Sequence, residues 1–332
     1  MHAAIALAIY AGLGWAMGQF GKRYGAVDDK EESAKDKAAP RGNTQLVTDS
    51  FVSIIYLLGA CSSGILPSLH DLKSTRAVLH NSVFWNRIPV SMMLGITEGL
   101  GTFLSVVVLG FAGRHSMTAV APVIMNGSFA MCAPVLVAFF FKESLGYWFW
   151  AGLLCLVLGI VLASGLASSN HGKAKMGPGL LIVVGSFFVA CFWSCGTLGT
   201  RYIMAEVPAD LKNSWSSVSY VVNVMPMWLS PFVSIVANAM FSDIDGSRVI
   251  AGVKKRSKVC FLCGMVSGTG GLSLQHALAE GGGASLVGLS QGVYNVSCVL
   301  IFKAIYQETL TWSQLFGINI MLMAIVLLSV AE

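Results

Sequence analysis

Residues 133–152 read APVLVAFFFKESLGYWFWAG: the end of one apolar stretch, a short charged hairpin and the start of the next apolar stretch. Residues 298–317 read CVLIFKAIYQETLTWSQLFG and repeat this arrangement 165 residues later, from Glu143 to Glu308. In both copies a glycine follows the hairpin glutamate nine residues on. The chain therefore contains two copies of one structural unit.

The composition is that of an integral membrane protein. Of the 332 residues, 55% are hydrophobic and 11% are charged, which leaves more apolar surface than a polar shell can cover. A helix that crosses a bilayer needs about 20 mainly apolar residues. Because the apolar stretches are continuous and do not alternate with polar residues, we expect an all-α integral membrane protein of ten transmembrane helices. The ten stretches are 2–20, 50–70, 88–112, 116–141, 147–167, 177–203, 214–241, 258–279, 284–306 and 312–330.

Each predicted helix of the first half has a counterpart in the second half. Matching positions are Trp15 and Trp193, Tyr56 and Tyr220, Gly95 and Gly264, Asn126 and Gln291, and Glu143 and Glu308. Because a unit has five spans, the second copy must enter the membrane from the opposite side, which predicts two inverted five-helix repeats, residues 1–167 and 168–332. The duplication of the first stretch also argues against a cleaved leader there.

The segments between the apolar stretches indicate which partners the protein can have. Residues 25–48 are polar and mixed in charge, so we expect a disordered loop. The basic residues at 254–258 are suited to anionic lipid headgroups. The net charge of +5 is spread over the connections, without the folded basic face that nucleic-acid binding requires, so we expect no nucleic-acid partner.

The eight cysteines lie in or beside apolar stretches. Cys260 and Cys263 have the spacing of a metal-binding pair, but a second pair of ligands is missing. We therefore expect buried free thiols, with neither a metal nor another cofactor.

With the five-plus-five repeat, one pattern in the first half is similar to that of a known family. The pattern joins a proline of the fourth stretch, the hairpin glutamate and two glycines, at Pro134, Glu143, Gly152 and Gly159. It resembles the drug/metabolite transporter superfamily and, within it, the ten-helix EamA-type transporters. The second copy departs from the pattern at Val299 and Ala324. The resemblance implies transport of a small polar or amphiphilic organic molecule, such as an amino acid, a sugar, a nucleotide sugar or a drug, but no single substrate.

Two arguments about topology disagree. The resemblance implies that both termini are cytoplasmic. The distribution of lysine and arginine favours the opposite orientation, since more of them lie in the connections after the odd-numbered helices. The sequence therefore leaves the orientation, and the plasma or organelle membrane in which the protein resides, open.

Glu98 is the first candidate for function. It lies midway along the third stretch, where an ionisable group is costly and usually has a role. It could bind an amine or hydroxyl of a substrate, or carry a proton during transport; a purely structural carboxyl is the alternative. The second copy has Ser267 at this position, so any coupling would involve one half only.

Amides form a second group of candidates. Asn126 and Gln291 occupy equivalent positions and each precedes a glycine, and Tyr294 and Asn295 extend the face of Gln291. These side chains could bind polar groups of a substrate, or they could form hydrogen bonds between helices, which are common in membranes.

Aromatic residues and one histidine complete the candidate site. Interfacial anchoring or core packing is the usual role of such residues in a membrane protein. The repeat pairs Trp15 with Trp193 and Tyr56 with Tyr220, and this correspondence adds a cavity-lining role as the functional alternative. His276 lies inside the eighth stretch, where it could relay protons near neutral pH or be satisfied by packing.

The combined interpretation is a secondary transporter with no cofactor, in which the first, third, fourth, sixth, eighth and ninth helices enclose a central cavity with alternating access. Its partners would be a small-molecule substrate, membrane lipids and, where transport is coupled, protons; the oligomeric state is open. One alternative is a sugar or nucleotide-sugar facilitator or exchanger, and another is a non-transporting membrane subunit of a larger assembly. Residues 288–292 match the Gly-x-Ser-x-Gly motif of hydrolases, but they lie in an apolar helix, so we expect no enzyme.

Overall fold

The computed structural model describes residues 2–25, 43–115, 117, 119–142, 146–164, 176–204, 207–279, 284–306 and 310–329. These residues form helices and their connections, with no strand among them. In chain order the elements are α1 (His2–Gly25), α3 (Asn43–His70), α4 (Leu72–Leu79), α5 (Ser82–Arg114), α6 (Ala121–Phe141), α7 (Tyr147–Ala163), α8 (Met176–Ile203), η2 (Ala209–Leu211), α9 (Lys212–Val224), η3 (Met225–Trp228), α10 (Leu229–Phe241), α11 (Gly246–Ala279), α12 (Ala284–Tyr306) and α13 (Trp312–Ser329).

The prediction of an all-α fold is confirmed for the residues that the structure describes. The described residues of the ten apolar stretches are helical, except residues 117, 119 and 120 before α6 and residue 164 after α7. Five helical segments of the described chain are long and apolar enough to cross a membrane: Asn43–His70, Ser82–Arg114, Ala121–Phe141, Pro178–Ile203 and Lys212–Phe241. The apolar helices α7, the 292–305 part of α12 and the 312–327 part of α13 are shorter.

Three helices begin earlier than their apolar stretches predict. α3 begins at Asn43, α5 at Ser82 and α11 at Gly246. Polar first turns hide these starts from a hydropathy argument, but they carry the capping residues that helices need. The side chain of Asn81 accepts hydrogen bonds from the backbone N–H groups of Val83 and Phe84, at 2.9 and 3.4 Å. The polar connection before α5 also contains the short helix α4, which the sequence analysis did not predict.

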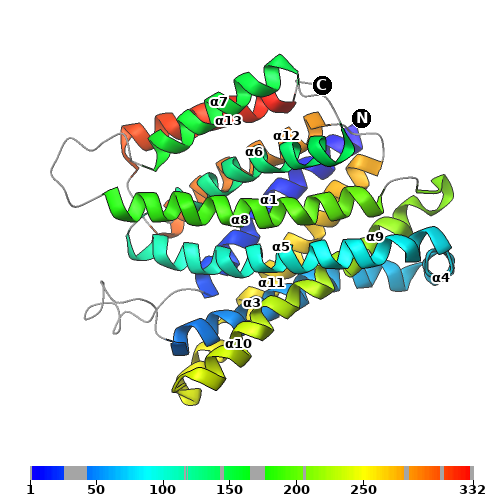
Figure 1. The fold of residues 1–332 in the computed structure, drawn as a ribbon, viewed down its shortest axis with the longest axis horizontal. Coiled ribbons are helices and arrows are strands. Elements are labelled where there is room, and N and C mark those ends of the chain that lie inside the picture. The colour runs from blue at the N-terminus through cyan, green and yellow to red at the C-terminus, as the bar shows by residue number, and fades with distance from the viewer. Residues whose placement is uncertain are drawn as a thin grey trace.

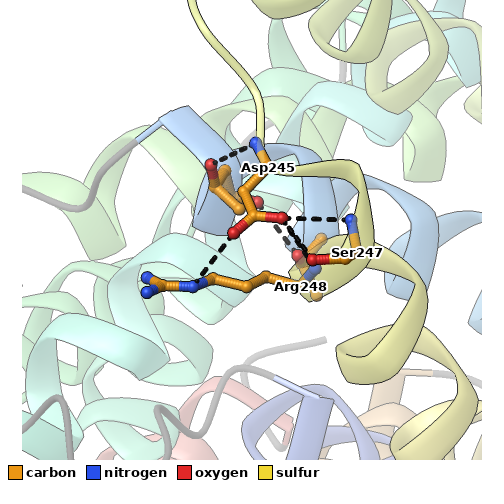
Figure 2. Close-up of polar contacts among 5 residues, drawn as sticks. Asp245, Ser247 and Arg248 are labelled. Carbon is orange, nitrogen blue, oxygen red and sulfur yellow. Dashed lines mark hydrogen bonds and ion pairs between the residues drawn. The ribbon is translucent and has the colours of Figure 1, made fainter.

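The start of α11 is held in the same way by Asp245 (Figure 2). Its carboxylate accepts hydrogen bonds from the Ser247 hydroxyl at 2.6 Å and from the backbone N–H groups of Ser247 and Arg248 at 3.1 and 3.2 Å. Arg248 also forms an ion pair with it at 3.1 Å. The basic residues of 254–258 therefore lie on a helix and not in a loop.

The helices run roughly along the long axis of the molecule, and α1 begins at the same end of the bundle at which α13 ends (Figure 1). α7 and α13 pack together along one edge, and α3 and α10 pack together on the opposite side. The largest buried apolar cluster joins α5, α6, α7, α8 and α13 and includes Leu109, Ile124, Leu156, Ile182 and Met321.

The inner helices pack in a reciprocal way. α1, from the first half, packs against α11 and α12, whereas α8, from the second half, packs against α5 and α6. Glycines allow this close approach: a Cβ atom on Gly59 would meet the backbone of α11, and one on Gly99 would meet the backbone of Met227 in η3. The spacing of Gly95 and Gly99 therefore serves helix packing.

A candidate substrate site between the inner helices

Glu98 lies at the middle of α5, with its side chain directed at α8. A Cβ atom on Gly196 of α8 would overlap the Glu98 carboxylate, so the carboxylate lies against the α8 backbone where only glycine leaves room for it. The side chain is deep among the helices, yet it keeps an intermediate solvent exposure. Glu98 is therefore not completely enclosed by its neighbours.

Lys22 on α1 is the residue that the sequence analysis missed. It is only 5% exposed, and its Nζ atom lies 5.0 Å from the centroids of both the Tyr56 ring and the Trp193 ring. An ammonium group gains cation–π stabilisation at such distances. Lys22 and Glu98 interact electrostatically, which brings one cationic and one anionic side chain into the same site.

The sequence does contain a signal for Lys22. Trp15, Gly18, Gln19 and Lys22 follow the spacing of one helix face. The apolar stretch was predicted to end at residue 20, which left Lys22 among the loop charges. The helix α1 continues to Gly25, so the last two turns carry the lysine back between neighbouring helices.

Tyr56 closes the site on the side of α3. Its hydroxyl donates a hydrogen bond to the Ser267 hydroxyl on α11 at 2.7 Å. A Cβ atom on Gly18 would lie 2.6 Å from both hydroxyl oxygens, so the glycine of α1 leaves room for this pair. α1, α3 and α11 therefore meet at one point beside Lys22.

Tyr220 and Trp15 lie next to this point. A Cβ atom on Gly271 of α11 would lie 3.1 Å from Cε2 of Tyr220 and 3.7 Å from Nε1 of Trp15. Tyr220 also interacts electrostatically with Tyr56 and Glu98. Of the predicted candidates, the structure thus brings Glu98, Tyr56, Tyr220, Trp15 and Trp193 to one region of the bundle.

The polar residues of α6 and α12 form a neighbouring cluster. Asn126 donates a hydrogen bond to Asn295 at 3.1 Å, and the Tyr294 hydroxyl donates one to the backbone carbonyl of Pro122 at 3.5 Å. Asn126 and Asn295 are both buried. The structure therefore shows the interhelical hydrogen bond that was the alternative to direct substrate contact for Asn126.

Gln19 links the two groups of residues. It is buried on the face of α1 that carries Lys22, and its side chain interacts with the Tyr294 hydroxyl. Within the described residues, Gln19 Oε1 and Asn295 Nδ2 are buried and have no hydrogen-bond partner. Such buried polar atoms are costly, so this part of the site has hydrogen-bonding capacity left for a ligand.

The remaining predicted features are His276, Gln291 and the two hairpin glutamates. His276 is half-buried near the end of α11. The side chain of Gln291 and the hairpin residues Glu143 and Glu308 lie outside the described residues. The glycines that follow Asn126 and Gln291 differ in their surroundings. A Cβ atom on Gly127 would lie 3.0 Å from the sulfur atom of Met321, whereas a Cβ atom on Gly292 would meet nothing within 4 Å.

All eight cysteines are free. Cys260 and Cys263 pack against α1, with the Cys260 thiol 3.3 Å from the carbonyl oxygen of Gly21. In the part of the chain that the structure describes, no group of three His, Cys, Asp or Glu side chains is placed to hold a metal ion. The chemistry that the site offers is recognition by an ammonium, a carboxylate, aromatic faces and hydroxyl groups.

The chain matches no protein-family model, and no curated protein matches it in sequence. The fold and the site therefore carry the functional argument.

Proposed function

We propose that this protein is a multi-pass secondary transporter of a small polar or amphiphilic organic molecule, with ten spans arranged as two inverted five-helix repeats, residues 1–167 and 168–332. In this proposal it resembles the EamA-type transporters of the drug/metabolite superfamily. The observation that carries the proposal is the pair of charges, Lys22 and Glu98, held between helices of a membrane protein. Charged groups at such depth usually belong to a transport pathway.

The packing of glycines supports the inverted repeat. Gly18 of α1 leaves room for Ser267 of α11, and Gly196 of α8 leaves room for Glu98 of α5. In the sequence alignment of the two halves, Gly18 corresponds to Gly196 and Ser267 corresponds to Glu98. The two contacts are therefore equivalent under exchange of the halves, as a two-fold axis in the membrane plane requires.

A second pair of contacts obeys the same rule. A Cβ atom on Gly14 of α1 would lie 3.1 Å from Cα of Gly270, and one on Gly101 of α5 would lie 2.9 Å from Cβ of Phe192. Gly14 corresponds to Phe192, and Gly270 corresponds to Gly101. Two pairs of equivalent contacts thus support the same symmetry.

Alternating access follows from this arrangement. The halves meet at interfaces with small residues, where α1 and α3 pack against α11 and where α5 packs against α8 and η3. Smooth interfaces of this kind allow one bundle to rock against the other around a central site. Glu98 keeps an intermediate exposure, so in this proposal it binds the substrate or exchanges a proton as the site opens to either side.

The proposal is tested with purified protein. Thermal unfolding across a library of small metabolites identifies ligands, because a ligand that binds the native state raises the melting temperature. Uptake of the stabilising solutes into proteoliposomes is then measured with and without a pH gradient. We expect flux that Glu98→Gln abolishes or uncouples from the pH gradient, while Asp210→Asn, at an exposed residue of η2, transports normally.

Two results would contradict this proposal. The first is a well-folded protein that carries none of its stabilising solutes across the liposome membrane. The second is a Glu98→Gln variant with normal flux and an unchanged dependence on pH, which would remove Glu98 from the transport pathway.

A further inference from the structure

Lys22 and Glu98 are unusual because they lie in one site with opposite charges but form no direct ion pair. Their charges interact, but among the described residues no ion pair or hydrogen bond joins the two side chains. Lys22 is only 5% exposed, and a buried ammonium group keeps a favourable free energy only with an anion or acceptors nearby. The faces of Tyr56 and Trp193 supply part of this stabilisation, but they do not accept the ammonium protons as oxygen atoms do.

The carboxylate of Glu98 presents the complementary case. No donor group of the described residues forms a hydrogen bond with it, and it lies against Gly196 of α8, at the position that a Cβ atom of residue 196 would take. An ionised carboxylate can accept several hydrogen bonds. Glu98 keeps an intermediate exposure, so a ligand can supply the donors.

From these two side chains we propose that the site binds a zwitterion, a compact solute that carries one carboxylate and one amine. This inference rests on the proposed function and names the substrate class of the same site. The carboxylate of the solute would bind Lys22 Nζ, and its amine would bind Glu98. The apolar body would lie against the rings of Tyr56 and Trp193.

A zwitterion fits better than a solute with one charge. A simple anion would leave Glu98 without a donor and would bring two negative charges together, and a simple cation would repel Lys22 in the same way. A neutral solute would leave both charges to be satisfied elsewhere. A zwitterion gives each protein charge an opposite partner and leaves no net charge in the site.

The inference is tested by binding to the full-length protein with matched probes. Each set holds an amino acid, the amine that lacks its carboxylate and the acid that lacks its amine: L-alanine with ethylamine and propionate, L-leucine with isopentylamine and isocaproate, and L-phenylalanine with phenethylamine and hydrocinnamate. Shifts in melting temperature give apparent affinities. We expect at least one zwitterion to bind about tenfold or more tightly than both of its analogues, because each loses one charge-assisted hydrogen bond.

Variants assign the two charges. In Lys22→Met the zwitterion should bind no better than its amine, and in Glu98→Gln it should bind no better than its acid. Lys303→Met is the matched control, since it makes the same change at an exposed lysine near the end of α12, and it should keep the full preference. If Lys22→Met does not fold, Lys22→Gln and the wild-type probe sets still decide the question.

Two outcomes would overturn the inference: a wild-type protein that prefers no zwitterion over its two analogues, or a preference that survives in folded Lys22→Met. The proposed function fails separately. If a zwitterion binds through Lys22 and Glu98 but is not carried into proteoliposomes, the binding inference holds and the proposed transport function is contradicted. If a solute is transported and its uptake is the same in the wild type and in Lys22→Met, the transport function holds and the zwitterion inference is contradicted.

Discussion

The carboxylate of Glu98 on α5 occupies the position at which any side chain larger than hydrogen at residue 196 of α8 would have to lie. The charged residue of one half thus packs against a glycine of the other half. The relation links helix packing to the candidate site, because the carboxylate keeps this position only while residue 196 has no side chain.

Gly196→Ala should therefore impair function more than stability. The methyl group would displace the end of a flexible side chain, and alanine gains up to about 1 kcal/mol of helix propensity over glycine, so we expect the free energy of unfolding to change by less than about 2 kcal/mol. Uptake in proteoliposomes should be lost because Glu98 is moved from its place. Normal uptake by this variant would show that the position of Glu98 is not needed.

Gly264→Ala, in contrast, should mainly lower stability. A Cβ atom at this residue of α11 would overlap the backbone carbonyl oxygen of Tyr56 on α3, and backbone atoms cannot move aside. We expect destabilisation by about 1–3 kcal/mol or more, measured by unfolding of the purified protein. Gly292→Ala is the matched control, since its Cβ would meet nothing within 4 Å; equal stability of the two variants would contradict the packing of α3 on α11.

The hydrogen bond between Tyr56 and Ser267 should appear as a coupling between α3 and α11. We expect Tyr56→Phe and Ser267→Ala to lower the free energy of unfolding by roughly 0.5–1.5 kcal/mol each. The double variant should cost less than the sum, because both changes remove the same bond. Strictly additive values in this double-mutant cycle would show that the bond contributes nothing to stability.

Trp215 should be the most sensitive position of the packing between α5, α8 and α9. Its ring is fully buried, it packs edge-on against Phe84 at 5.1 Å, and its Nε1 donates a hydrogen bond to the Ile203 carbonyl at 2.9 Å. Trp215→Ala should cost about 3–5 kcal/mol. Trp215→Phe should cost less, since it keeps an aromatic ring but loses the hydrogen bond, and a ranking in the other order would argue against this environment.

Two carboxylates outside the membrane-spanning segments should make stability depend on acid. Hydrogen bonds from Ser247 and the backbone of Arg248 lower the pKa of Asp245, and hydrogen bonds from Ser74 lower the pKa of Asp71. Their contribution is complete above the unfolded-state pKa of about 3.9 and is lost as the pH falls through the lower folded-state values.

The variant Asp245→Asn separates this contribution from other acid effects. Asparagine still accepts hydrogen bonds at the start of α11 but does not titrate. We expect a melting temperature that falls less steeply below about pH 4 than that of the wild type. An identical acid profile would show that the contacts in Figure 2 do not hold Asp245 in its charged form.

The helices were predictable because each is a local property of the chain. A continuous apolar stretch must form its own hydrogen bonds in a membrane, so its location follows from composition alone. The ends were less predictable: the polar first turns of α3, α5 and α11 carry no hydropathy signal. Whether they are helical depends on caps such as Asn81 and Asp245 and on neighbours that cover one face.

The residues of the candidate site also differ in how far the sequence alone could identify them. The sequence by itself identified Glu98, because a carboxylate in the middle of an apolar stretch is conspicuous wherever its neighbours lie. Lys22 stands at the end of its stretch, where a lysine usually reaches water. Only the tertiary structure decided that α1 continues past it and that α3 and α8 place the rings of Tyr56 and Trp193 around its ammonium group. Burial of a charge at a helix end is a property of the surrounding helices, and these are brought together by glycine contacts between residues far apart in the chain.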